Sequence, residues 1–551
     1  MNYPDNIQIK PENNYYKTMK CIEKNEYILT ALIIILVVSI ANIHTIYGLD
    51  RLVQDDNGRY FEYITDSLEN TSNRSITGLA WPNKVFIVSL FSRYSVEHAR
   101  LFVLFMYMIP LSFLFYLFNR KFLQLSLWTS LASAVLVNII PTQYQIPAFL
   151  DGSYVAPGVL FFIATLIFAS LYLEATRTNI ILLIFTSTVW FVVCDTIAEM
   201  GIFLFPALLF IIYTSPANYR RKIYLYLTTT LITIAKIFTY IQLPKTPTNK
   251  PIELSLNEIT SRITKSLEWW SPVGKDTYIS VIFVILAISL TIFAYIKLRD
   301  SSDKQYLQRA YKFYFIWFLF AAAPFWLLTN YFFVRYFYIA YFGLTTMVLM
   351  AVHQLFTSKF RTNKAIFISS LFLIFFIYGF QRYIFNMNPY YFWNTQGKSI
   401  SSLLRHEQIN PGTQIVLANI HLGTVGFYTW STGYLQHLLK EPEVRGIIGE
   451  EINFYDPFNH KHCSELYKMS CLNTNDRLIA YKWDSNYKFV RMSYFLQWKT
   501  QEAGASNWSL YGTNKDDQLH VISKGSGIDQ YKTTLSELDI DPKDVLWGNY
   551  N

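Results

Sequence analysis

Long apolar runs constrain this chain more than any other feature of its sequence. A helix that crosses the hydrocarbon core of a bilayer needs about 20 mainly apolar residues. Runs of this kind recur throughout the part of the sequence that precedes residue 384, and we count about eleven of them. The sequence therefore predicts an α-helical polytopic membrane protein, with helices at about 27–48, 98–118, 122–140, 155–174, 179–195, 200–213, 223–242, 278–297, 313–329, 335–356 and 365–383.

The composition supports this prediction and excludes some partners. Hydrophobic residues make up 52% of the chain and charged residues 15%, whereas soluble domains average about 25% charged residues. The net charge of +9 lies mainly in loops between apolar runs, which is an orientation signal and not a nucleic-acid surface. The sequence also lacks a Walker-type loop and a dinucleotide fingerprint. We therefore expect neither a nucleic acid nor a nucleotide as partner.

The basic residues alternate from one loop to the next. Loops around 141–154, 195–199 and 329–334 contain no Lys or Arg, whereas the other short loops carry Arg120, Lys121, Arg177, Arg220, Arg221, Lys222, Lys297, Arg299, Lys304, Arg309, Lys312, Lys359, Arg361 and Lys364. The positive-inside rule then predicts a cytoplasmic N-terminus. With eleven crossings, the C-terminal part lies outside, on the periplasmic face of a bacterial inner membrane.

This orientation divides the chain into three parts. Residues 1–26 form a basic cytoplasmic leader, and the first apolar run follows without a clear small-residue cleavage site, which predicts a retained helix. Residues 27–383 form the transmembrane domain. The fifth and sixth runs are short and nearly touch, so the sequence leaves open whether they are separate helices.

Two outside loops are long, at about 49–97 and 243–277. Within the second, Ser255 and Glu258 have the spacing of a capping box. Apolar residues then recur at helical spacing from Leu256 to Trp270, which predicts an amphipathic helix. Two alternatives stay open: the helix lies on the membrane surface, or it packs on the protein itself.

Residues 384–551 differ in character and predict a soluble α/β domain. Strand-like runs occur at Gln414–Leu417, Leu478–Trp483 and Leu519–Ile522, with helical stretches between them. Cys463 and Cys471 lie close together in an oxidising compartment and are the candidates for a disulfide. A zinc site with His460 and His462 is the alternative, although the spacing matches no usual ligand pattern.

The strongest candidates for catalytic residues follow the first helix. Asp55 and Asp56 are adjacent there, on the predicted outer face. Alone, either carboxylate is explained as a helix N-cap. Other ionisable residues share that face and depth, however, and such residues usually line a cavity or pair with one another. They are Asp151, Asp195, Glu199, Lys236 and Arg335. The structural alternatives are snorkelling for Lys236, a solvated turn for Asp195 and Glu199, and interfacial anchoring for Arg335.

This arrangement resembles a known family. A first outside loop with an acidic pair, then Arg59-Tyr60 and an amphipathic helix, is similar to the GT-C membrane glycosyltransferases. The Asp55-Asp56-x-x-Arg59 pattern with Trp81-Pro82 downstream most resembles the serotype-converting O-antigen glucosyltransferases, and the helical layout is also similar to aminoarabinose transferases and protein mannosyltransferases. The resemblance covers the topology of about 1–383, is sharp only around 55–60, and says little about the tail.

The resemblance implies transfer of a hexose, with glucose as the first choice, from a polyprenyl-phosphate donor to a lipid-linked or surface glycan such as O-antigen. Transfer requires a base for the acceptor hydroxyl, for which we choose Asp55 with Asp56 as partner, or the reverse. Arg335, then Lys236 and Arg59, are the candidates for the departing phosphate. Asp151, Asp195 and Glu199 are candidates for sugar hydroxyls. No cofactor or metal is required, although a divalent cation between carboxylates fits.

Three other functions remain as alternatives. A flippase or transporter for a lipid-linked glycan often has internal repeats and paired broken helices, and the sequence contains no evident repeat. A glycan polymerase or ligase uses similar outside acids and bases, so the sequence separates it poorly from a transferase. A structural scaffold leaves the ionisable residues at membrane depth unexplained.

Overall fold

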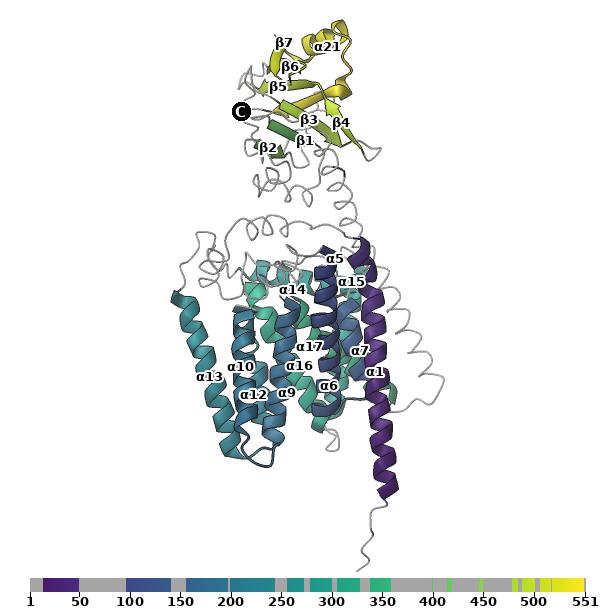
Figure 1. The fold of residues 1–551 in the computed structure, drawn as a ribbon, viewed down its shortest axis with the longest axis vertical. Helices are drawn as coiled ribbons and strands as arrows, with labels where there is room; N and C mark the ends of the chain where they lie inside the picture. Colours follow the sequence, from purple (N-terminus) through teal and green to yellow (C-terminus); the bar gives the residue numbers. More distant parts are fainter. Residues whose placement is uncertain are drawn as a thin grey trace, which may run out of the picture.

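The structure is a computed structural model, drawn in Figure 1. It describes residues 13–48, 96–139, 155–196, 199–242, 255–271, 278–299, 305–327, 337–357, 399, 414–418, 445–448, 478–483, 488–500, 506–516 and 518–549. Within these ranges, the chain up to residue 357 is almost entirely helical, and strands dominate from residue 414 onward.

The described helices overlap ten of the eleven predicted spans, and the last of them, 365–383, lies outside the described residues. The fifth and sixth spans are separate helices, because α10 ends at Thr196 and α11 begins at Glu199. The elements are α1 (Asn13–Gly48), α5 (Val96–Val103), η1 (Leu104–Met108), α6 (Ile109–Leu117), η2 (Phe118–Phe122), α7 (Leu127–Leu136), η3 (Val137–Ile139), α9 (Val155–Glu174), α10 (Ile180–Thr196), α11 (Glu199–Phe203), α12 (Phe205–Thr214), α13 (Tyr219–Gln242), α14 (Leu256–Trp270), α15 (Tyr278–Arg299), α16 (Gln305–Leu327) and α17 (Tyr338–Thr357).

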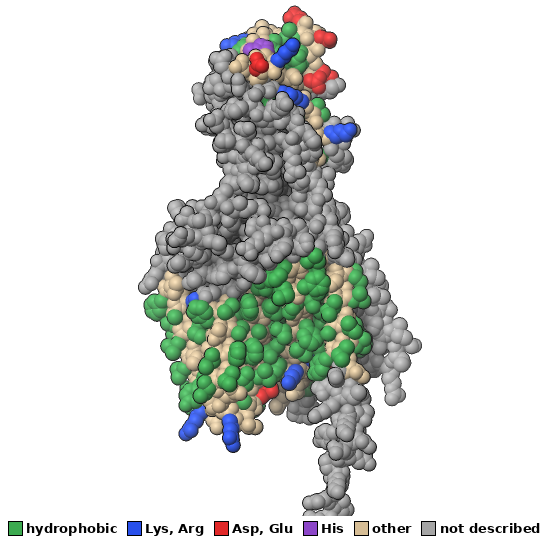
Figure 2. Space-filling model, viewed as in Figure 1, with side chains coloured by type: hydrophobic (Ala, Val, Ile, Leu, Met, Phe, Trp, Pro, Cys, Tyr) green, Lys and Arg blue, Asp and Glu red, His purple; other side chains and the backbone are tan. Residues whose placement is uncertain are grey.

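The outer surface of this bundle suits a membrane. Five stretches of helix among the described residues are long and apolar enough to cross one: Asn25–Asn42, Arg100–Phe122, Val155–Glu174, Val281–Leu298 and Gln305–Leu327. Shorter apolar helices cover Leu127–Leu136, Ile180–Cys194 and Gly201–Thr214. Figure 2 shows hydrophobic side chains spread over the visible face of the bundle, with Lys and Arg along its lower edge. The prediction of a helical membrane protein agrees with these features, and the number of eleven crossings stays a prediction.

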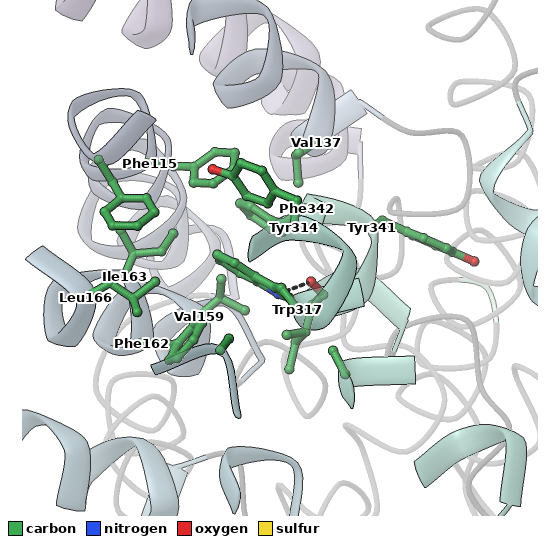
Figure 3. Packing of buried hydrophobic residues seen from close by; sticks show 14 of the residues in the cluster. Phe115, Val137, Val159, Phe162, Ile163, Leu166, Tyr314, Trp317, Tyr341 and Phe342 are labelled. Carbon is green, nitrogen blue, oxygen red and sulfur yellow. Dashed lines mark hydrogen bonds between the residues drawn. The ribbon is translucent and has the colours of Figure 1, made fainter. Parts of the chain in front are cut away.

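Aromatic side chains fill the centre of the bundle (Figure 3). Trp317 of α16 stacks on Phe342 of α17, with ring centroids 6.1 Å apart and planes 5° apart. Phe162 of α9 meets the same indole edge-on at 4.9 Å, and Phe115 of α6 meets Phe342 at 4.9 Å. Trp317 Nε1 also donates to the Ile339 carbonyl at 2.9 Å. These contacts join α6, α9, α16 and α17 through one core.

Polar side chains inside the bundle bond to one another. Asn138 Nδ2 donates to Ser112 Oγ at 2.7 Å, and the Tyr338 hydroxyl donates to Asn138 Oδ1 at 3.1 Å. Asn119 Nδ2 donates to Ser133 Oγ at 2.9 Å, and the Tyr314 hydroxyl donates to Asn119 Oδ1. Without water in hydrocarbon, buried polar groups must find protein partners. We interpret both networks as links between helices and not as catalytic groups.

The helix predicted at 255–270 is α14, and it packs on the protein itself. Trp270 Nε1 donates to Thr345 Oγ1 of α17 at 2.9 Å, and the Tyr341 hydroxyl donates to the Ser266 carbonyl at 2.6 Å. Ser255 is the N-cap residue, as predicted, but its side chain makes no capping hydrogen bond. Glu258 instead accepts from Arg262 at 2.7 Å, because an i,i+4 ion pair competes for its carboxylate. The second alternative for this helix is therefore the observed one, and the predicted capping box does not form.

The described C-terminal strands form two sheets, and the three predicted strands are among them. The first sheet has the order β2-β1-β3-β4, from β1 (Gln414–Ala418), β2 (Arg445–Ile448), β3 (Leu478–Trp483) and β4 (Phe489–Met492). β1 pairs in parallel with β2 and β3, and β4 is antiparallel to β3.

The second sheet has the order β7-β6-β5-β8, from β5 (Tyr494–Thr500), β6 (Ser506–Thr513), β7 (Leu519–Ser526) and β8 (Val545–Asn549). Helix α21 (Ile528–Glu537) packs beside it, with the Tyr531 and Trp508 ring centroids 5.4 Å apart. A strand region with a helix agrees with the predicted α/β character, whereas the boundary at residue 384 stays a prediction.

Candidate functional site

Most of the site residues predicted from the sequence lie outside the described residues. This applies to Asp55, Asp56, Arg59, Asp151 and Arg335, and to the candidate disulfide of Cys463 and Cys471. Their roles stay predictions. Three predicted site residues lie on described helices: Lys236 on α13, Asp195 on α10 and Glu199 on α11.

Lys236 lies six residues before the end of α13, and its side chain is only 5% exposed. The ammonium nitrogen lies 3.8 Å from the centroid of the Phe191 ring on α10. A cation over an aromatic face is attracted by the negative charge density of that face, and the attraction grows when water is excluded. The alternative of snorkelling toward water is therefore not what the structure shows, because Lys236 is buried against protein.

Helices α10 and α13 lie side by side (Figure 1), and their register is fixed by a hydrogen bond from Trp190 Nε1 to Thr233 Oγ1 at 3.0 Å. Asp195 lies one turn beyond Phe191, in the last turn of α10. Glu199 is the first residue of α11, which also packs against α13. The fold thus brings the backbone positions of Asp195 and Glu199 to the same end of the bundle as Lys236, and the predicted bracketing of the α10–α11 turn is confirmed.

A close backbone contact sets the α10–α11 turn. Gly201 on α11 lies so near α10 that an added Cβ would sit 2.7 Å from the Val193 carbonyl oxygen and 2.9 Å from Cys194 Cα. Only glycine permits this approach, since a Cβ at such distances clashes with backbone atoms that cannot swing away. The sequence Glu199-Met-Gly201 therefore folds back tightly onto the end of α10.

Arg100 on α5 is a buried cation that the sequence reasoning missed. Its side chain is 1% exposed, and among the described residues Arg100 and Lys236 are the two buried side chains with a full charge. Burying a guanidinium is costly unless other groups compensate its charge. The available signal was its position at the start of the second apolar run, on the predicted outer side. An arginine beside an apolar run usually indicates a residue that anchors the helix at the membrane interface, so its position did not predict burial.

Helix α14 adds further polar groups at the ends of α16 and α17. Arg262 Nη1 donates to the Trp326 carbonyl near the end of α16 at 3.2 Å, in addition to its ion pair with Glu258. Trp326 Nε1 donates to Ser266 Oγ at 3.0 Å. These bonds fix α14 across the ends of two core helices. By the predicted topology, this is the same outer end that carries Arg100 and Lys236.

No group of three or more His, Cys, Asp or Glu able to hold a metal ion occurs within the described ranges. Comparison with known proteins adds no identification: no family model matches this chain, and no curated protein matches it. The geometry therefore gives a buried Lys236 on α13, near the backbone positions of Asp195 and Glu199, and a separate buried cation, Arg100, on α5.

Proposed function

We propose that this protein is a GT-C type glycosyltransferase that moves a hexose, with glucose as the first candidate, from a polyprenyl-phosphate donor to a lipid-linked or surface glycan. The observation that carries the proposal is the buried Lys236 ammonium, at the end of the bundle where α10 and α11 hold Asp195 and Glu199. A desolvated cation is suited to a phosphate that gains negative charge as its bond to the sugar breaks. Arg100 on α5 is the other buried cation among the described residues, and its part in the reaction is tested separately.

The remaining roles follow the sequence pattern. Asp55 takes the proton from the acceptor hydroxyl, and Asp56 raises the basicity of its neighbour by repulsion or orients it. Arg59 and Arg335 assist at the donor phosphate, and Asp151, Asp195 and Glu199 bind sugar hydroxyls. We place the N-terminus in the cytoplasm of a bacterium and the C-terminal domain in the periplasm, on the side of the reaction, because the basic loops alternate in that sense.

The test is sugar transfer in proteoliposomes. Labelled polyprenyl-phosphate glucose is mixed with lipid-linked glycans, and the wild type is compared with Asp55→Asn, Asp56→Asn, Lys236→Gln and Arg100→Gln. We expect transfer to fall about 100-fold or more without the base, and by a similar factor without the cation at the phosphate. Lys297→Gln is the matched control, because Lys297 is exposed near the end of α15, on the predicted cytoplasmic side.

Each other outcome has a defined meaning. Undiminished transfer in both aspartate variants reduces the acidic pair to a helix cap. Undiminished transfer in Lys236→Gln contradicts the role of Lys236 at the donor phosphate, and with it the main support for the proposal. Movement of the lipid-linked sugar between leaflets without transfer identifies a flippase, and growth of the glycan by whole repeat units identifies a polymerase. Circular dichroism of each variant separates loss of activity from loss of fold.

A further inference from the structure

A cavity of about 640 Å³ opens at the end of the bundle opposite the α10–α11 turn. Its walls come from the end of η2 at Phe122, the end of α12 at Thr214 and the start of α16 at Gln305. Helix α12 follows α11 in the chain and ends at this cavity, so α11 and α12 together connect the α10–α11 turn to it. The alternation of basic loops predicts that this end of the bundle faces the cytoplasm.

The charged groups of the cavity are cations. Arg309 lies in the wall with Nε donating to Thr214 Oγ1 at 2.9 Å, and no further hydrogen bond joins its guanidinium to another described residue. Lys312 follows on the same helix and is exposed. None of the described residues that line the cavity is acidic. Glu174 attracts Arg309 electrostatically from outside the lining, and Arg309 lines the cavity with no acidic neighbour among the lining residues that the structure describes.

The rest of the lining is apolar and aromatic. Phe122, Leu123 and Phe210 supply hydrocarbon surface beside the cations. Tyr213 and Tyr306 also line the cavity and are 83% and 42% exposed. Tyrosine is enriched where headgroups meet hydrocarbon, because its ring is apolar and its hydroxyl is polar. A soluble anion would bind through the cations alone. A phospholipid would bind its phosphate at the cations and its glycerol and acyl chains at the apolar and aromatic residues.

We propose that this cavity binds the phosphate of an anionic membrane phospholipid. Arg309 and Lys312 contact the phosphate oxygens, for which the planar guanidinium has matching geometry, and the glycerol region lies against Phe122 and Phe210. Basic pockets between helices on the cytoplasmic side are suited to such headgroups. The proposal does not depend on sugar transfer, since it concerns the opposite end of the bundle.

The experiment is lipid titration of the delipidated full-length protein, followed by native mass spectrometry. Three probes are compared: phosphatidylglycerol, phosphatidylcholine and inorganic phosphate. The variants are Arg309→Gln and Lys312→Gln, with Lys297→Gln as the matched control, because Lys297 is an exposed lysine of α15 that does not line the cavity. Removing one charge-assisted hydrogen bond should weaken phosphatidylglycerol binding about tenfold. The wild type and Lys297→Gln should bind it equally.

The outcomes decide between the sources of the phosphate. Preference for phosphatidylglycerol over phosphatidylcholine, lost in both cavity variants and kept in the control, supports the proposal. Equal binding of the two lipids, or a preference that survives both substitutions, overturns it. Inorganic phosphate that binds as tightly as the lipid and displaces it overturns the lipid assignment in favour of a soluble anion. If Arg309→Gln fails to fold, Lys312→Gln still decides, because Lys312 is exposed.

Discussion

A lysine near the end of an apolar helix has two ways to avoid hydrocarbon. It can extend its stem toward water, or it can place its ammonium against protein groups. Lys236 takes the second way, since its side chain is 5% exposed and its nitrogen lies 3.8 Å from the Phe191 ring centroid. A desolvated cation–π contact contributes about 2 kcal/mol, which does not by itself offset the loss of hydration. A lysine buried within the bundle is a stronger candidate for function than one at the surface, because ionisable groups at membrane depth usually line a cavity or pair with one another.

Gly201 is the residue on which the α10–α11 turn depends. We expect Gly201→Ala to destabilise the protein by about 1–3 kcal/mol, the usual cost of inserting atoms into a packed site, because the new Cβ would lie 2.7 Å from the Val193 carbonyl oxygen. Thermal unfolding followed by circular dichroism measures the change. Leu231→Ala is the control, since Leu231 is 65% exposed on α13. A melting temperature equal to wild type for Gly201→Ala would show that the two helices are not this close.

The predictability of the site differed from residue to residue. The sequence placed Asp195 and Glu199 between two short apolar runs but left open whether these runs are separate helices, because no local pattern shows how closely Gly201 approaches α10. The burial of Lys236 was not predictable, since snorkelling and burial require the same sequence. Arg100 was missed because an arginine beside an apolar run is usually a flanking anchor, and its 1% exposure depends on packing that no local pattern encodes.

At the scale of elements, the periodicity of the sequence predicted helix α14, but it did not predict the surface on which the helix packs. A membrane surface and a protein surface both select an apolar stripe, so the stripe alone cannot distinguish them. The deciding information lies in distant residues such as Thr345 and Tyr341, which bond to α14. The strands were predictable in the same limited way: β1, β3 and β7 were predicted, whereas β5 was not, although it carries four β-branched or aromatic residues.

The docking of α14 can be tested with Trp270→Phe. The substitution removes the hydrogen bond to Thr345 Oγ1 and part of a buried ring. Hydrogen bonds between membrane helices average about 0.6 kcal/mol, and with the lost packing we expect destabilisation of about 1–2 kcal/mol. Leu256→Ala is the matched control on the same helix, because Leu256 is 81% exposed. If α14 instead lay on lipid, the control would weaken membrane attachment and Trp270→Phe would leave the melting temperature unchanged.

At the scale of the whole molecule, charge and hydrophobicity together set how the bundle lies in a bilayer. Figure 2 shows several Lys and Arg side chains at the lower edge of the apolar surface and one cation at its upper border, and the orientation in the membrane stays a prediction. The structure adds the positions of two groups of cations that the sequence did not reveal. Lys236 lies at the end with the α10–α11 turn, and the cavity of Arg309 and Lys312 lies at the other. The proposed chemistry and the proposed lipid site are therefore on opposite faces.

This division requires the predicted orientation, which single cysteines can test. In a background without the native cysteines, Leu256→Cys and Arg220→Cys place a thiol on α14 and at the start of α13, where Leu256 and Arg220 are both exposed. A membrane-impermeant maleimide added to intact spheroplasts should label Leu256→Cys, and should label Arg220→Cys only after the membrane is permeabilised. Labelling in the reverse order would invert the protein, placing Lys236 toward the cytoplasm and the cavity outside. Sugar transfer from an outer-leaflet donor would then be excluded, because the buried cation and the donor phosphate would lie on different sides of the bilayer.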